Sequence, residues 1–234
     1  LSSAASDVYK RQTLLDAGVD VGMVQVGNET NNGIAGENGL ENANTTAIFR
    51  AGCEAIQQVE QERSRVIKAV VHFANPEKQN YMTYADELAK AGVEYDVFAS
   101  SYYPYWHGTL DNLKNQLNAI TEKYGKEVMV AETSWATGLE DSDGHANTVR
   151  EGNNDAGMDY DFSIYGQAKE LREVINTVAE MNKGIGVFYW EPAWIPVKVY
   201  DPEAEDAEQT LATNKAAWEK YGSGWAASYA KEYD

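Results

Sequence analysis

Short apolar segments alternate along this chain with longer segments whose apolar positions recur at helical spacing. The short segments predict five buried strands, at residues 21–26, 65–72, 96–102, 127–131 and 185–190. The longer segments predict five helices, at residues 13–17, 45–61, 81–90, 109–124 and 163–182. Most of these helices end close to a glycine, which favours a helix terminus. A polar loop is expected over residues 137–158, and an acidic, irregular tail is expected after residue 196.

Strands as apolar as these, each followed by a helix, predict an α/β fold with a parallel sheet that is covered on both faces or closed into a barrel. A dinucleotide-binding fold is disfavoured, because residues 27–30 (Gly-Asn-Glu-Thr) do not fit the glycine-rich fingerprint. Polar and aromatic residues instead follow the carboxyl ends of all five strands, where a (β/α)8 TIM barrel carries its chemistry. Five units fall short of the eight in such a barrel, so we expect a partial (β/α)8 barrel.

The composition narrows the function classes. Lys and Arg total 19 against 37 Asp and Glu, and the formal net charge of −18 argues against nucleic-acid and anionic-membrane partners. No apolar run reaches the length of about 18 residues that a membrane span needs. The single cysteine, Cys53, excludes an internal disulfide and a cysteine-based zinc cluster. Aromatic residues make up 11% of the chain, which fits a protein that stacks rings on sugars.

The first twelve residues differ from the rest of the chain. Residues 1–12 lack apolar periodicity and carry the dibasic pair Lys10 and Arg11, and they contain no apolar signal-peptide core. We interpret residues 1–12 as a non-native, adapter-derived leader and residues 13–234 as a partial catalytic domain.

Two glutamates stand at predicted strand ends. Glu29 follows the strand at residues 21–26, and Glu132 follows the strand at residues 127–131. Glycoside hydrolysis with retention needs two carboxyl groups about 5–5.5 Å apart, and neighbouring strand ends of a barrel can supply that gap. Either glutamate alone could simply end a strand at the rim of the sheet. The two together, within Asn-Glu and Glu-Thr-Ser-Trp, favour the catalytic interpretation.

Four segments carry a family resemblance. They are residues 25–30 (Gln-Val-Gly-Asn-Glu-Thr), 101–107 (Ser-Tyr-Tyr-Pro-Tyr-Trp-His), 131–135 (Ala-Glu-Thr-Ser-Trp) and 189–194 (Tyr-Trp-Glu-Pro-Ala-Trp). Together they resemble the arabinogalactan endo-β-1,4-galactanases of glycoside hydrolase family 53, from residue 13 almost to the end of the chain. In that clan the acid/base follows strand four and the nucleophile strand seven. The resemblance therefore implies that this chain holds strands four to eight, without the first three βα units and the C-terminal end.

The resemblance also implies roles for single residues. Glu29 would be the acid/base and Glu132 the nucleophile. Asn28 matches the residue that hydrogen-bonds the sugar 2-hydroxyl, a contact that can strengthen in the transition state. Tyr103 is the candidate donor that orients the nucleophile, and Tyr102 is the alternative if the register is shifted by one residue.

Further candidates come from the remaining strand ends. His72 binds a sugar hydroxyl, helps to hold Glu29, or is a structural hydrogen-bond partner. Trp106, Trp190 and Trp194 are candidate sugar platforms, although a tryptophan after a strand can equally fill a core. Trp190 is the preferred platform, because its predicted position faces the mouth of the site.

A loop after the fourth predicted strand contains possible metal ligands. Asp141, Asp143, His145 and Asn147 place oxygen or nitrogen atoms at alternate positions, and carboxylate and amide oxygens suit Ca²⁺. The spacing alone favours a solvated turn. The resemblance implies a structural calcium site that takes further ligands from a segment near the C-terminus. No matching Ser/Asp pair occurs before Asp234, so we expect this site to be incomplete within the chain.

The favoured function is a retaining endo-β-1,4-galactanase that cleaves (arabino)galactan by a two-glutamate double displacement. The alternatives are a related glycosidase acting on mannan, xylan or glucan, and an inactive carbohydrate-binding fragment. The expected partner is the polysaccharide, with no nucleic acid and no membrane, and the complete protein is expected to be a monomer. Secretion to the extracellular space is inferred from the family and the substrate. The chain alone is expected to be inactive and prone to aggregation, because an open sheet edge exposes unpaired backbone groups.

Overall fold

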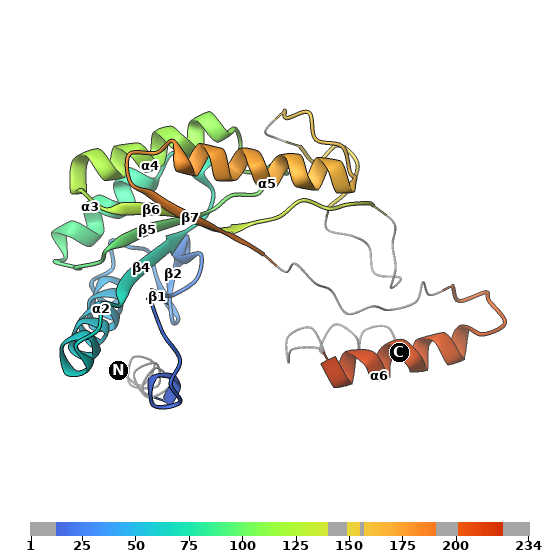
Figure 1. Ribbon diagram of the computed structural model, residues 1–234, viewed down its shortest axis with the longest axis horizontal. Helices are drawn as coiled ribbons and strands as arrows, with labels where there is room; N and C mark the ends of the chain where they lie inside the picture. Colours follow the sequence, from blue (N-terminus) through green and yellow to red (C-terminus); the bar gives the residue numbers. More distant parts are fainter. Residues whose placement is uncertain (1–12, 140–148, 155–156, 191–200, 222–234) are drawn as a thin grey trace.

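A five-stranded parallel sheet forms the centre of the protein (Figure 1). The computed structural model describes residues 13–139, 149–154, 157–190 and 201–221. The strands are β1 (Met23–Val26), β4 (Lys68–Phe73), β5 (Val97–Ser101), β6 (Glu127–Thr133) and β7 (Gly184–Tyr189). They lie in the order β1-β4-β5-β6-β7, so each strand pairs with the strand that follows it in this series. This is the arrangement of consecutive βα units in a barrel wall, and it confirms the predicted parallel sheet.

Four helices connect these strands and cover the outer face of the sheet (Figure 1). They are α2 (Ala43–Arg63), α3 (Tyr81–Lys90), α4 (Leu110–Tyr124) and α5 (Ile164–Ala179). Side-chain caps begin three of them: Asn42 accepts a hydrogen bond from the Asn44 N–H, Thr109 from Asn112, and Ser163 from Gly166. These helices occupy the regions that the sequence predicts, with ends that differ by a few residues.

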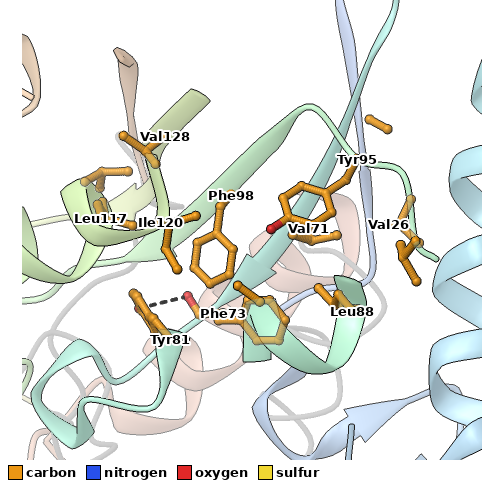
Figure 2. Packing of buried hydrophobic residues seen from close by; sticks show 14 of the residues in the cluster. Val26, Val71, Phe73, Tyr81, Leu88, Tyr95, Phe98, Leu117, Ile120 and Val128 are labelled. Carbon is orange, nitrogen blue, oxygen red and sulfur yellow. Dashed lines mark hydrogen bonds between the residues drawn. The ribbon is translucent and has the colours of Figure 1, made fainter. Parts of the chain in front are cut away.

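The strand alternation separates two cores. Residues that point outward from the sheet pack against the helices in a large aromatic and aliphatic cluster, which includes Phe73, Phe98 and Tyr81 (Figure 2). Residues that point inward form a smaller cluster of Val70, Val97, Ala99 and Met129. Because successive strand residues face opposite sides, His72 and Ser101 lie on the same inner face as this smaller cluster.

An irregularity in β6 changes that alternation. Val130 belongs to the outer core, and the Thr133 hydroxyl bonds to Glu170 of α5, so both residues face the helices. Two outward residues three positions apart break the period of two, and the pairing of β6 with β7 shifts between these same positions. Glu132, which directly precedes Thr133, is thereby turned toward the inner face.

Four elements differ from the sequence-based expectations. A helix, α6 (Ala207–Tyr221), occupies part of the tail that was expected to be irregular. Its residues are mostly good helix formers, and the prediction missed it because it lacks a clear apolar stripe. After β1 the chain forms a 3-10 turn, η1 (Thr30–Asn32), and a short antiparallel pair, β2 (Gly33–Ile34) and β3 (Glu37–Asn38), which were also not predicted.

Two further expectations concern the loop and membrane spans. The described residues of the loop at 137–158 contain neither helix nor strand, as expected. The proposed leader, residues 1–12, lies outside the described residues. Within the described ranges, no helix is both long and apolar enough to cross a membrane.

Candidate active site

The carboxyl ends of four neighbouring strands bring the predicted catalytic residues to one edge of the sheet. Glu29 follows β1, His72 lies near the end of β4, Ser101 ends β5, and Glu132 lies near the end of β6. Parallel strands end at the same edge, which is where α/β barrels build their active sites.

A tight turn presents Glu29. Its backbone is left-handed, with φ 45° and ψ 53°, a conformation that costs a non-glycine residue about 1 kcal/mol or more. Gly27 also has a positive φ of 79°, and a Cβ there would meet Thr30 Cγ2 at 2.5 Å. The buried Thr30 hydroxyl donates to the His72 carbonyl over 2.8 Å, which pins the turn to β4. The surrounding structure therefore imposes the backbone of Glu29.

The side chain of Glu29 is held by Ser101, which in turn is held by His72. Ser101 Oγ lies 2.7 Å from Glu29 Oε1, and His72 Nε2 lies 2.9 Å from the same Oγ. Ser101 and His72 are both fully buried. Burial lowers the pKa of His72 from its usual 6.5 to about 4, so the imidazole is neutral near pH 7. The histidine therefore acts on Glu29 through hydrogen bonds and without a positive charge.

Glu132 has different surroundings. Its side chain is buried, and the Tyr103 hydroxyl donates to Glu132 Oε2 over 2.9 Å. The Glu132 carbonyl accepts from the Tyr102 N–H, so β5 and β6 remain paired up to the carboxylate. In the sheet, Ser101 is the register partner of Glu132. Ser101 thus bonds to one carboxyl group and lies beside the other, which brings the two glutamates into one site.

An aromatic cluster borders Glu132. Tyr105, Trp135 and Phe162 stack with ring centroids 4.6 to 6.5 Å apart, and Trp106 lies 6.1 Å from the ring of Tyr103. Trp135 is fully buried and is part of the core, whereas Trp106 is half-buried. Such rings form rigid apolar walls.

Comparison with known proteins identifies the family. The family profile of glycosyl hydrolase family 53 matches residues 7–232. The chain belongs to glycosyl hydrolase family 53. It is 48% identical to an endo-beta-1,4-galactanase of Bacillus subtilis over 225 residues, covering 95% of this chain and 49% of that protein. It is 34% identical to an arabinogalactan endo-beta-1,4-galactanase of Humicola insolens, covering 77% of this chain and 54% of that protein.

Solved structures of the family agree with the fold. A family 53 catalytic domain of Ignisphaera aggregans superposes with a TM-score of 0.73 at 35% identity, covering 83% of this chain and 54% of that chain. A structure of fungal β-1,4-galactanases gives a TM-score of 0.68 at 29% identity, covering 82% and 58%. The chain is a partial (β/α)8 barrel and spans about half the length of the curated relatives it matches.

The structure of this family 53 chain shows which of the two candidate tyrosines contacts Glu132. The Tyr103 hydroxyl reaches Glu132, whereas the buried Tyr102 hydroxyl donates to the Gly108 carbonyl. His72 contacts Asn28 and Ser101, which corresponds to the expected role of holding Glu29. These contacts position the residues, and their roles in catalysis stay predictions.

The other predicted site residues are only partly described. Trp190 follows β7 and is 47% exposed, which leaves its ring open to a ligand. The candidate calcium ligands Asp141, Asp143, His145 and Asn147 lie outside the described residues, and so does Trp194. Within the described ranges, no group of three or more His, Cys, Asp or Glu side chains could hold a metal ion.

Sequence reasoning missed Ser101 and Glu170. Ser101 bonds to Glu29, which lies 72 positions away in the sequence. Its signal was available, because a serine at an inward position of an otherwise apolar strand needs a polar partner. Glu170 of α5 is buried behind β6, where it accepts from the Thr133 hydroxyl over 2.6 Å. Burial raises the pKa of Glu170 from 4.5 to about 7. A lone glutamate on a predicted helix gives no such signal.

Proposed function

We propose that the protein carrying this chain is a retaining endo-β-1,4-galactanase that hydrolyses (arabino)galactan. The observation that carries this proposal is the placement of Glu29 and Glu132 at the same edge of a family 53 barrel sheet, where Ser101 bonds to Glu29 and is the register partner of Glu132. The names of the Bacillus and Humicola relatives support the substrate.

The proposed reaction is a double displacement. Glu132 attacks the anomeric carbon, and the bond from that carbon to the glycosidic oxygen breaks while Glu29 gives its proton to the leaving oxygen. Water then attacks the glycosyl-enzyme, Glu29 takes a proton from that water, and the bond to Glu132 breaks. The anomeric configuration is retained, because the carbon is inverted twice.

The surroundings of the two carboxyl groups support this assignment. An ionised Glu132 has no hydrogen to donate, so the Tyr103 hydroxyl acts as the donor in this contact. A hydrogen bond to the charged carboxylate suits a nucleophile. Ser101 can donate to Glu29 or accept from it, which suits a group that must alternate between acid and base.

The test is reducing-end release from linear β-1,4-galactan. We would join the chain to the segments that the Bacillus subtilis relative carries beyond the matched region, and compare this protein with its Glu132→Gln variant. Release by the parent and a loss of several orders of magnitude in the variant are expected. Activity on mannan, xylan or glucan instead would contradict the galactan assignment. The absence of activity on all four polysaccharides would favour a binding function.

We also propose that calcium stabilises the complete protein and that the protein acts outside the cell as a monomer. The donor set of Asp141, Asp143, His145 and Asn147 supports the metal, since three of the four side chains offer oxygen. The size of the polysaccharide supports the extracellular location. Size-exclusion chromatography of the extended protein tests the monomer.

Chelation tests the calcium proposal. Excess EGTA should lower the melting temperature of the extended protein by several degrees, and added Ca²⁺ should restore it, because a ligand that binds only the folded state stabilises that state. Asp143→Asn should weaken this response, whereas Asp111→Asn on α4 should leave it unchanged. A melting temperature that is insensitive to EGTA would contradict the proposal.

A further inference from the structure

A continuous chain of hydrogen bonds runs from β1 to Glu29 across three strands. We call this chain the relay; its members are Gln25, Asn28, His72, Ser101 and Glu29. The successive contacts are 3.1, 3.1, 2.9 and 2.7 Å long. Every distance lies within hydrogen-bond range, so each contact needs one donor and one acceptor.

The first contact sets the direction of the relay. Gln25 Nε2 lies 2.8 Å from the Gly27 carbonyl, which can only accept, so the amide nitrogen of Gln25 must face it. The same NH2 group then donates its other hydrogen to Asn28 Oδ1. Because that oxygen is an acceptor, a hydrogen bond between it and His72 Nδ1 forms when Nδ1 carries the imidazole hydrogen.

This direction has a consequence at the other end. A neutral imidazole with hydrogen on Nδ1 has a lone pair on Nε2, so Nε2 accepts from the Ser101 hydroxyl. The Ser101 hydroxyl then donates its only hydrogen to His72. The contact of 2.7 Å between Ser101 Oγ and Glu29 Oε1 then needs its hydrogen from Glu29. One state of the relay therefore matches a protonated Glu29.

The opposite direction is also built into the site. The backbone N–H of Glu29 points at His72 Nδ1 over 3.4 Å and can donate to it when that nitrogen carries no hydrogen. His72 Nε2–H then donates to Ser101, and the Ser101 hydroxyl donates to an ionised Glu29. In this second state Nδ1 carries no hydrogen, so the hydrogen bond from Nδ1 to Asn28 Oδ1 is lost.

We propose that the relay couples the proton on Glu29 to the tautomer of His72. A protonated Glu29 is matched by hydrogen on Nδ1, and an ionised Glu29 by hydrogen on Nε2. Serine and neutral histidine can each donate or accept, so both forms of Glu29 keep a hydrogen-bond partner. A lysine or arginine in the place of Ser101 would serve only the ionised form. The benefit for catalysis rests on the proposed acid/base role of Glu29, but the coupling itself does not need a substrate.

Other titratable groups surround the relay. Tyr81 of α3 and Glu77 of η2 (Pro76–Lys78) lie behind β5, and Glu132 with Tyr103 lies beside it. Burial raises the pKa of Tyr81 far above its usual range, so this phenol stays neutral. His72 itself has a pKa of about 4 and remains neutral above about pH 5. Changes of its tautomer between pH 5 and pH 9 therefore report other groups.

The test is ¹⁵N NMR of the histidine side chains. We would label the histidines of the extended protein selectively and assign the His72 signals with the variant His72→Gln. In the parent protein, hydrogen on His72 should move from Nδ1 to Nε2 as the pH rises and Glu29 loses its proton. In Ser101→Ala and in Glu29→Gln, the tautomer should not change with pH. A parent protein without such a change, or a change that persists in either variant, would overturn the proposal.

Two controls keep the test independent of misfolding and of galactanase activity. Ser100→Ala removes the neighbouring hydroxyl, which bonds to Tyr81 on the outer face, and it should behave like the parent. His107 accepts from the Tyr103 N–H over 3.0 Å, so its signal in the same spectrum reports that the end of β5 is folded. The spectrum contains no substrate, so a coupled tautomer in a protein inactive on galactan would refute only the function.

Kinetics give a second readout in the extended protein. Ser101→Ala should lower kcat about tenfold with little change in KM, and it should move the pH profile of kcat, because the acid/base loses its partner. Ser100→Ala should change neither quantity. A pH profile that is unchanged in Ser101→Ala would overturn the coupling.

Discussion

Glu29 and Glu132 both follow apolar strands, yet the protein places their side chains in opposite surroundings. Glu29 is exposed at the end of β1 and is held by a serine and a neutral histidine. Glu132 is buried and receives a phenol hydroxyl. Partners that can both donate and accept allow a carboxyl group to gain and lose a proton, whereas a phenol, which can only donate to a carboxylate near neutral pH, favours a lasting negative charge. Two equivalent residues in the sequence thus become suited to two different steps.

The largest effects are expected when each carboxyl group is removed in turn, because this tests whether Glu29 and Glu132 have different roles. In the extended protein, Glu132→Ala should lower kcat/KM by roughly 10⁴-fold or more on galactan and on aryl β-galactosides, because no nucleophile remains. Glu29→Ala should cost about 10²- to 10⁴-fold on galactan and far less on an aryl substrate whose leaving group needs no proton. Initial rates on both substrates check this. Equal losses for Glu29→Ala on the two substrates would contradict its role as the acid.

The adjacent residues Tyr102 and Tyr103 provide a matched pair of variants that tests the hydrogen bond to Glu132. Tyr103→Phe should lower kcat about 10- to 100-fold, because Glu132 loses a hydrogen bond to its charged form. Tyr102→Phe loses a hydroxyl that donates to the Gly108 carbonyl, so it should lower the free energy of unfolding by about 1 kcal/mol with kcat unchanged. Steady-state kinetics and urea unfolding separate the two effects. A kcat loss confined to Tyr102→Phe would reverse the assignment.

The smallest effect concerns the carboxyl group behind Glu132. The pKa of Glu170 is raised from 4.5 to about 7, so the folded state retains a proton that the unfolded chain releases. The stabilisation from this group is therefore present below about pH 4.5 and is lost as the pH rises through about 7. Glu170→Gln should flatten this decline and stabilise the protein by about 1–3 kcal/mol at pH 8.

Urea unfolding at several pH values measures the Glu170 effect. Glu122→Gln, at an exposed position of α4, is the matched control and should keep the slope of the parent. A slope that persists in Glu170→Gln would assign the pH dependence to another group.

Much of the barrel wall could be predicted from local sequence patterns. The five strands and the four helices between them follow from apolar periodicity, and Glu29 and Glu132 stand out because each lies just after an apolar strand segment. The helix at Ala207–Tyr221 was missed, because it has helix propensity without an apolar stripe to reveal it.

Glu132 shows where local reasoning ends. The alternation of faces predicts a side-chain direction only while a strand stays regular. The side chains of β5 stay regular, so Ser101 lies on the inner face and Tyr102 packs in the outer core with Phe98. The strand β6 is irregular after Val130, and a single irregularity reverses every later side chain. Contacts with the neighbouring strands therefore decide that Glu132 faces inward.

The sequence by itself determined the order of strands and helices and the chemical groups at the strand ends, because both depend on residues close together in the chain. The tertiary structure alone decided which groups meet: Ser101 with Glu29, Tyr103 with Glu132, and Thr133 with Glu170. These pairs are 72, 29 and 37 residues apart, so only the pairing and curvature of the sheet bring them together. Burial in that sheet then made His72 neutral and gave the two glutamates different partners.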